Sequence, residues 1–231
     1  MTGATGHFTP GLFEFLREVE ANNNREWFMP NKARYEHDVR DPVLGFIADL
    51  APGLRGISRH LVADPKPVGG SMFRIYRDTR LSRDKRPYKS VVKMAFKHAG
   101  VPRGAADPGF FLELKPGGGW AAGGVYMADA AALTRIRDAI ANDPGGWQAV
   151  RDRPEFLPMF GPPASALKNV PARYPADHPL ADDLRRRDYV WHLHFPEADV
   201  CSPGFLDRYL AAGAVASPFN RFLARALALE W

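Results

Sequence analysis

The sequence predicts one α+β domain, in which an antiparallel β-sheet meander is covered by N-terminal and C-terminal helices. Three observations lead to this prediction. Apolar residues recur at helical spacing over about residues 9–52, they alternate with polar residues at strand spacing over about 68–127, and helices with irregular chain return over 129–231. A chain of 231 residues, 45% of them hydrophobic, has the size and apolar content of one domain with a sizeable core, so we expect residues 1–231 to form a single domain.

The N-terminal part is expected to contain three helical stretches. Thr9 and Pro10 are typical of a helix start, and an apolar stripe at helical spacing follows until the three asparagines at 22–24. A second stretch follows and restarts at Pro30. A third occupies residues 42–53, where the Pro-Gly pair at its end is expected to stop the helix.

Four segments between residues 71 and 127 alternate as strands. They are Ser71–Asp78, Val91–Lys97, Phe110–Lys115 and a short strand around Val125–Met127. In the first of them, Phe73 and Ile75 are expected to face the core. Because no helical crossover joins the segments, we expect them to pair antiparallel in sequence order. The glycines at 117–119 and 123–124 match no nucleotide-binding motif and are expected to form a flexible hairpin.

The last hundred residues alternate helix and coil. Asp129 is expected to cap a helix that runs through Asn142. Seven prolines between residues 153 and 179 predict irregular chain. The remaining predicted elements are a helix at 182–187, a strand at 189–195 and two closing helices at about 203–213 and 218–229.

Positive charge is concentrated in one segment. Residues 74–97 contain nine basic and two acidic residues, a balance of +7, whereas the whole chain carries +5, so the other residues sum to −2. Such concentration favours an anionic partner. Residues 77–90 also form a 14-residue connection between two predicted strands, a length typical of functional or disordered loops. Residues 73–97, the basic segment, are therefore the candidate site region.

The predicted strand pairing places a mixed polar set on one sheet face beside this loop. Arg74, Tyr76, Lys93, Phe111 and Glu113 would share that face and form a pocket floor, in which Glu113 is a candidate acid or base. The candidate ligand-binding residues are Arg74, Tyr76, Arg77, Arg80, Lys85, Tyr88, Lys89 and Lys93.

Other residue types restrict the functional classes. The one cysteine, Cys201, excludes an intramolecular disulfide, and residues 1–6 lack the basic and apolar regions of a signal peptide, so a cytoplasmic protein outside the membrane is expected. His192 and His194 would share a strand face and could share a metal, but no further ligand accompanies them at metal-binding spacing. The sequence predicts no metal site and indicates no particular cofactor.

Two motifs resemble those of a known family. Residues 22–28 (NNNREWF) and, more strongly, residues 73–80 (FRIYRDTR) with Pro87-Tyr88-Lys89 are similar to the hallmark segments of a bacterial and fungal family catalogued as domain of unknown function 2461. The similarity extends over nearly the whole chain. The resemblance implies one conserved domain and no particular activity or catalytic residue.

Three hypotheses for the basic segment follow from the residues. The first is that it binds, and could act on, a phosphorylated or otherwise anionic ligand. The second is nucleic-acid binding through the same patch, with Tyr76 and Tyr88 stacking on bases. The third is structural, with Asp78 and Asp84 pairing with neighbouring arginines to hold the loop in shape. The sequence leaves open whether the protein is an enzyme.

Overall fold

Five antiparallel strands form one sheet in the order β1-β2-β3-β4-β5, which confirms the predicted α+β meander. The computed structural model describes residues 6–80, 82–102, 104–163 and 165–231, and the strands are those of these residues. Their bounds are β1 (Leu61–Val62), β2 (Val92–His98), β3 (Phe110–Lys115), β4 (Gly118–Val125) and β5 (Tyr189–Phe195).

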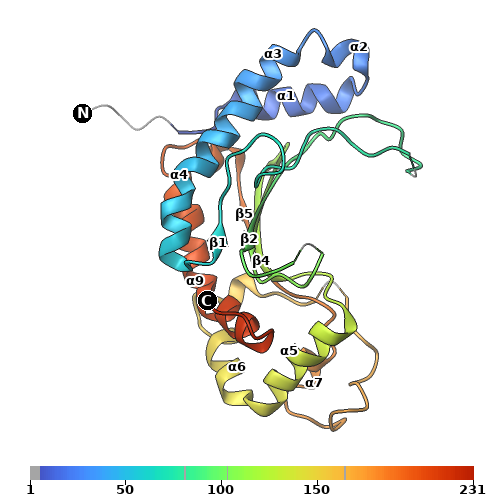
Figure 1. Ribbon diagram of the computed structural model, residues 1–231, viewed down its shortest axis with the longest axis vertical. Helices are drawn as coiled ribbons and strands as arrows, with labels where there is room; N and C mark the ends of the chain where they lie inside the picture. The colour runs from blue at the N-terminus through green and yellow to red at the C-terminus, as the bar shows by residue number, and fades with distance from the viewer. Residues whose placement is uncertain (1–5, 81, 103, 164) are drawn as a thin grey trace.

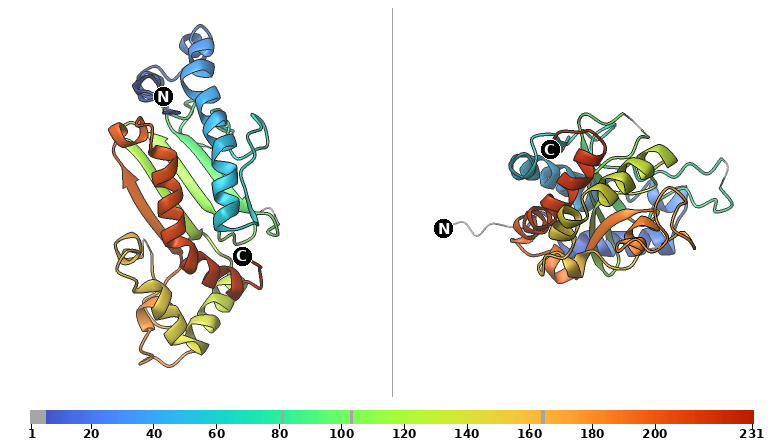
Figure 2. Two further views of the ribbon diagram at one scale, coloured as in Figure 1. Left: turned by 90° about the vertical axis from the view of Figure 1, so that its left-hand side faces the viewer. Right: turned by 90° about the horizontal axis from the view of Figure 1, so that it is seen from below.

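The sheet has an inner face that is covered by helices and an outer face that is not. Alternation along β2 and β3 buries Met94, Phe96 and Leu112 on the inner face, whereas Lys93 and Glu113 point to the outer face. Helices α4 (Asp41–Ile57) and α9 (Phe205–Ala226) lie side by side across the inner face (Figures 1 and 2). The outer face lies on the opposite side of the sheet, below the extended loop that carries most of the basic segment (Figure 1).

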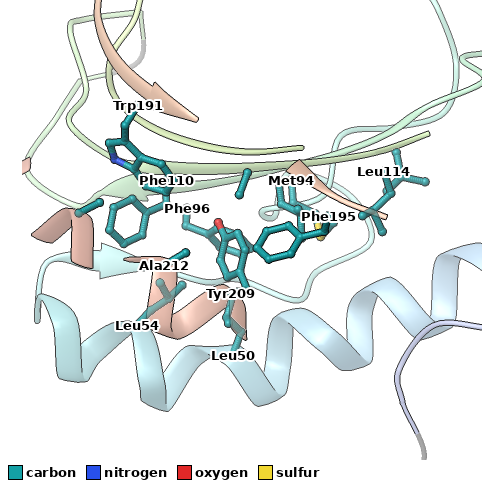
Figure 3. Close-up of a cluster of buried hydrophobic side chains, with 14 of the residues drawn as sticks. Leu50, Leu54, Met94, Phe96, Phe110, Leu114, Trp191, Phe195, Tyr209 and Ala212 are labelled. Atoms are coloured by element: carbon teal, nitrogen blue, oxygen red, sulfur yellow. The ribbon is translucent and has the colours of Figure 1, made fainter. Parts of the chain in front are cut away.

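The core lies between α4, α9 and the inner face. Tyr209 of α9 points into it between Leu50 of α4 and Phe96 of β2 (Figure 3). Phe110 and Trp191 continue the same layer along the sheet, with ring centroids 5.6 Å apart in an edge-to-face arrangement. This layer is formed by chain segments from both ends of the sequence, so it holds the two helices and the sheet together as one unit.

The N-terminal helices agree with the predicted order but not with the predicted end of the third. The observed elements are α1 (Pro10–Ala21), α2 (Arg25–Phe28), α3 (Lys32–Tyr35), the π-helical η1 (Glu36–Arg40) and α4. Helix α4 runs through Pro52 and Gly53 to Ile57, so the predicted stop is wrong. The reason is tertiary packing: a Cβ on Gly53 would lie 2.3 Å from Cδ1 of Leu210 in α9, so this glycine lets α9 approach α4 closely.

The predicted strand at Ser71–Asp78 is wrong in its regularity. The segment makes only isolated bridges, Met72 with Met94 and Tyr76 with Tyr88. The two bridges do not share one pairing register, so extra residues between them interrupt the ladder of paired residues. Ile75 is buried as predicted, but Phe73 is 44% exposed instead of lying in the core. Residues 74–80 and 82–90, which we call the arm, therefore project beyond the sheet as an irregular ribbon (Figure 1).

The glycine-rich segment is part of a hairpin, as predicted, but most of it is a regular strand. Gly117 lies in the turn after β3, whereas the glycines from 118 to 124 belong to the strand. This strand is β4, paired with β3 on one side and β5 on the other. The glycines are required by close packing. Gly124 has φ +98°, and a Cβ on it would lie 2.2 Å from the carbonyl oxygen of Tyr189, while a Cβ on Gly123 would clash with Phe110 and Trp191.

The C-terminal half contains α5 (Ala130–Asn142), α6 (Pro144–Arg151), the 3₁₀ turn η2 (Leu157–Met159), α7 (Ala181–Leu184), α8 (Glu197–Val200) and α9. The Asp129 side chain caps α5 by accepting from the Ala132 N–H at 2.7 Å, as predicted. The two predicted closing helices are one, because α9 continues through Pro218. Among the described residues, no helix has both the length and the apolar character needed to cross a bilayer.

Asn220 of α9 is expected to be essential for stability. Its side chain is fully buried, accepts a 2.9 Å hydrogen bond from Trp191 Nε1 and donates a 2.7 Å bond to the Pro108 carbonyl. Asn220→Ala leaves these groups unpaired and should lower the free energy of unfolding by about 2 kcal/mol or more, measured by denaturant titration. Arg221→Ala, at the exposed neighbouring position, should change it by less than about 0.5 kcal/mol, and equal losses in both variants would contradict the role assigned to Asn220.

Candidate functional site

The outer face of the sheet carries a row of polar and aromatic side chains at the end nearest the arm. Strand register places Lys93 opposite Glu113, Glu113 opposite Trp120 and Trp120 opposite His194. Phe111 lies in the next row, with its ring edge-to-face against Trp120 at 6.0 Å. The predicted grouping of Lys93, Phe111 and Glu113 on one face is therefore observed.

Positive charge gathers where the arm meets this row. The Lys89 ammonium donates a 2.7 Å hydrogen bond to the Arg74 carbonyl and lies 6.0 Å from the centre of the Phe73 ring. Burial, together with the charges of Arg74, Lys93 and Arg77, lowers the pKa of Lys89. We call Arg74, Arg77, Lys89 and Lys93 the basic cluster.

Ion pairs neutralise part of this charge. Arg77 contacts Asp84 at 2.8 Å, and Arg86 contacts the same carboxylate at 2.7 Å. Hydrogen bonds from Arg86, reinforced by the charges of Arg77 and Arg86, hold the pKa of Asp84 well below its usual range. Among the described residues, no carboxylate lies within ion-pair distance of Arg74 or Lys89, so these two cations carry the excess charge of the cluster.

The outer part of the arm is internally bonded. Arg80 forms a bidentate pair with Asp78, with the closest contact at 2.6 Å, and both side chains are exposed. Lys85 donates to the Thr79 carbonyl at 2.9 Å. Arg80 and Lys85, which the sequence suggested as ligand-binding residues, therefore both have hydrogen-bond partners within the arm.

An aromatic stack anchors the arm to the N-terminal helices. Tyr88 is buried and stacks on Phe28 of α2 with centroids 4.0 Å apart, and Tyr76 packs against Tyr88 at 5.6 Å. Asn23 accepts a hydrogen bond from the Tyr88 N–H and donates one to the Tyr88 carbonyl, both at 3.0 Å. The two sequence motifs at residues 22–28 and 73–89 thus meet at this contact. The Tyr88 ring already packs against the side chains of Phe28 and Tyr76.

Glu113 is held between two lysines. Its carboxylate contacts Lys93 Nζ at 3.1 Å and Lys115 Nζ at 3.4 Å, and its side chain is 14% exposed. Both carboxylate oxygens are therefore used in ion pairs within the sheet face. The contact holds the Lys93 side chain against β3 and neutralises part of its charge.

Arg74 and Tyr76 do not share the sheet face with Glu113. They line a broad depression of about 870 Å³ between the base of the arm, α3 and η1, which also includes Tyr35 and Lys97. Burial raises the pKa of Tyr35 to about 12. The predicted pocket floor is thus divided, because the irregular pairing of residues 71–77 turns Arg74 and Tyr76 away from the row that holds Lys93 and Glu113.

Histidine and cysteine chemistry has little support at this site. His192 and His194 share the outer face of β5, with ring centroids 6.2 Å apart. In the part of the chain that the structure describes, no group of three or more His, Cys, Asp or Glu side chains is arranged to hold a metal. Burial raises the pKa of the Cys201 thiol, which disfavours the reactive thiolate.

Sequence reasoning missed Trp120 and Asn23 as residues that shape the site. Trp120 was overlooked because its glycine-rich segment was interpreted as a loop, so no sheet face was assigned to it. The one large side chain in the small-residue run Gly118–Val125 is the signal that could have marked Trp120 as a residue with a defined sheet face. Asn23 makes its contact 65 residues away along the chain, for which periodicity offers no signal.

Asn23→Ala is expected to loosen the arm without unfolding the domain. The variant loses both hydrogen bonds to the Tyr88 backbone, while the core on the inner face keeps its contacts. We expect limited trypsin digestion to cut after arm residues several-fold faster than in the parent protein, with little change in melting temperature. Glu14→Ala on the exposed side of α1 is the matched control, and equal cutting rates in all three proteins would contradict the anchor.

Comparison with known proteins gives a family without a described activity. Searches of curated proteins and of solved structures returned no match to the chain. A family described as "Conserved hypothetical protein (DUF2461)" matches residues 11–222, which include both motifs that meet at the arm anchor and every residue of the basic cluster. The chain therefore belongs to the DUF2461 family.

Proposed function

We propose that the protein is a cytoplasmic binding protein for a phosphorylated or otherwise anionic small molecule, and that the basic cluster holds the anionic group. Lys89 has no carboxylate within ion-pair distance among the described residues, and neither has Arg74, which adds its charge from the adjoining depression. Lys93 is presented by β2 and pairs with Glu113 of β3. Arg77 adds a guanidinium that is already fixed by Asp84.

The position of Lys89 is the observation that carries this proposal. Its ammonium donates to the Arg74 carbonyl at 2.7 Å, lies 6.0 Å from the centre of the Phe73 ring and has no carboxylate within ion-pair distance among the described residues. Partial burial and the charges of Arg74, Lys93 and Arg77 lower its pKa, which agrees with this position. A bound phosphate or carboxylate would offset the repulsion between these cations.

Binding is a better supported role for the cluster than acid–base catalysis. Glu113, the candidate acid or base, has a lysine at each side, and proton transfer would require these contacts to rearrange. Nucleic-acid binding is the weaker alternative, because Tyr88, one of the two rings expected to stack on bases, is buried against Phe28.

Removing charge from the cluster should abolish anion binding. We expect the double variant Lys89→Gln/Lys93→Gln to bind inorganic phosphate at least about tenfold more weakly than the parent protein, measured by isothermal titration calorimetry. Lys168→Gln and Arg80→Gln remove one positive charge from the C-terminal half and from the outer arm, and each should change the affinity little. Unchanged phosphate affinity in the double variant, or no phosphate binding by the parent protein, would refute the proposal.

The same measurements separate the small anion from nucleic acid. A short single-stranded oligonucleotide that binds tightly should show a steep fall of affinity with salt, since each neutralised phosphate releases counterions. We expect phosphate to compete with any such oligonucleotide at the basic cluster. Oligonucleotide binding that is tight, salt-dependent and insensitive to phosphate would favour the alternative function.

Anion affinity should depend on pH through Lys89. Because the pKa of Lys89 lies below the usual value of lysine, its charge is lost at a lower pH than that of an ordinary lysine. Sulfate is a suitable probe because its own charge stays constant over this pH range. Its affinity should be constant at pH values below the pKa of Lys89 and should fall as the pH rises through that pKa. In Lys89→Arg the charge persists, so the fall should move to higher pH. A fall at the same pH in both proteins would exclude Lys89 as its source.

A further inference from the structure

A small hollow lies on the same sheet face as Lys93, two strands away from it. It measures about 260 Å³ and lies between the outer face of β4 and β5 and the irregular chain that precedes α7. Its walls include Trp120, His192 and His194 from the strands, Pro162 and Pro163 from the irregular chain, and Tyr126. Pockets for whole drug-sized ligands span about 300 to 1,000 Å³, so this hollow suits one ring system and not a large ligand.

The wall opposite the strands is held firmly in place. The Arg186 guanidinium is 9% exposed, donates to the Gly161 carbonyl at 3.0 Å and lies 4.0 Å above the Phe160 ring. Asp183 contacts the same guanidinium at 3.4 Å. These contacts fix the backbone before Pro162, so the width of the hollow is set by the fold and does not depend on a ligand.

Several hydrogen-bonding groups face the hollow without a protein partner. Within the described residues, Trp120 Nε1 and the ring nitrogens of His192 and His194 make no hydrogen bond. The Trp120 and His192 rings lie 6.2 Å apart and are tilted by 32°. An aromatic wall with free donors and acceptors beside it is suited to a planar heterocycle, which offers both a π-face and polar edges.

The hollow and the basic cluster lie at a distance that one small molecule can span. Lys93, Glu113 and Trp120 occupy consecutive strands in one row, so Lys93 and Trp120 are two strands apart. Strand spacing makes this about 10 Å. Glu113 lies between them and can accept a hydrogen bond from a hydroxyl group of a ligand that crosses it.

From this juxtaposition we infer that the ligand is a nucleotide, with its base in the hollow against Trp120 and its phosphate at Lys89 and Lys93. The inference rests on the proposed function, because the basic cluster supplies the phosphate contact. It adds the class of ligand and a second contact region for the same molecule. The sugar hydroxyls lie over Glu113, whose carboxylate offers an acceptor to them.

Three probes divide the ligand into its parts: adenosine monophosphate, adenosine and inorganic phosphate. We expect adenosine monophosphate to bind the parent protein about tenfold or more tighter than phosphate, since stacking of a base on an aromatic side chain supplies that factor. Trp120→Ala should reduce its affinity to that of phosphate and leave phosphate affinity unchanged. Trp120→Phe keeps a ring and should retain most of the difference.

Retained phosphate binding also shows that a variant is folded. If Trp120→Ala binds no phosphate, Val190→Phe tests the role of the hollow instead, because its larger side chain fills the hollow from β5 and leaves Trp120 in place. It should likewise lose the preference for the nucleotide.

Each outcome separates the two proposals. Phosphate binding without a preference for adenosine monophosphate, or a preference that survives both substitutions, overturns the nucleotide inference while the proposed function stands. If the parent protein binds neither phosphate nor adenosine monophosphate, both the nucleotide inference and the proposed function are overturned.

Discussion

Burial of the sheet on one face only is the constraint on which the rest of the structure depends. Helices α4 and α9 fill the inner face, and they can do so because small residues bring them close: a Cβ on Gly53 would clash with Leu210, and a Cβ on Gly213 would lie 3.0 Å from the Phe110 ring. Strand alternation then sends every second side chain to the outer face, on the side of the sheet away from α4 and α9 (Figure 1). Lys93, Glu113 and Trp120 consequently point away from the core.

The arm shows how a highly charged segment can be largely satisfied and still leave a local excess of charge. Its carboxylates are placed at the outer part of the ribbon, where Asp78 and Asp84 pair with arginines two residues away. Such exposed pairs contribute little stability, so they shape the arm more than they stabilise the domain. At the base of the arm, beside the sheet, cations outnumber carboxylates, and the charges of Arg74, Lys93 and Arg77 act on Lys89. The ion pairs of the basic segment and its cations without a carboxylate partner therefore lie in different parts of it.

Local sequence patterns predicted the elements in which buried and exposed positions alternate regularly along the chain. Phe110–Lys115 and Tyr189–Phe195 begin and end where alternation placed them, and Asp129 caps its helix as its residue type indicated. The errors occur where distant residues decide. Pro52 and Pro218 remain inside helices because tertiary packing supports the chain on both sides, and the glycines of β4 form a strand because Phe110, Tyr189 and Trp191 leave no room for side chains. The same limit applies to the outer face. Alternation predicted that Lys93 and Glu113 would lie on it, but did not place Trp120 there.

The position of Glu113 limits what can lie along the outer face. A polyphosphate stretched from Lys93 toward Trp120 would pass a carboxylate, and this repulsion would offset part of the attraction from the basic cluster. A ligand that changes from anion to neutral hydrogen-bond donor to planar ring along its length meets lysine, carboxylate and tryptophan in the matching order. For the ligand that we propose, the alternation of charge across neighbouring strands would favour a single anionic end. The same residues also stabilise the sheet by cross-strand pairing.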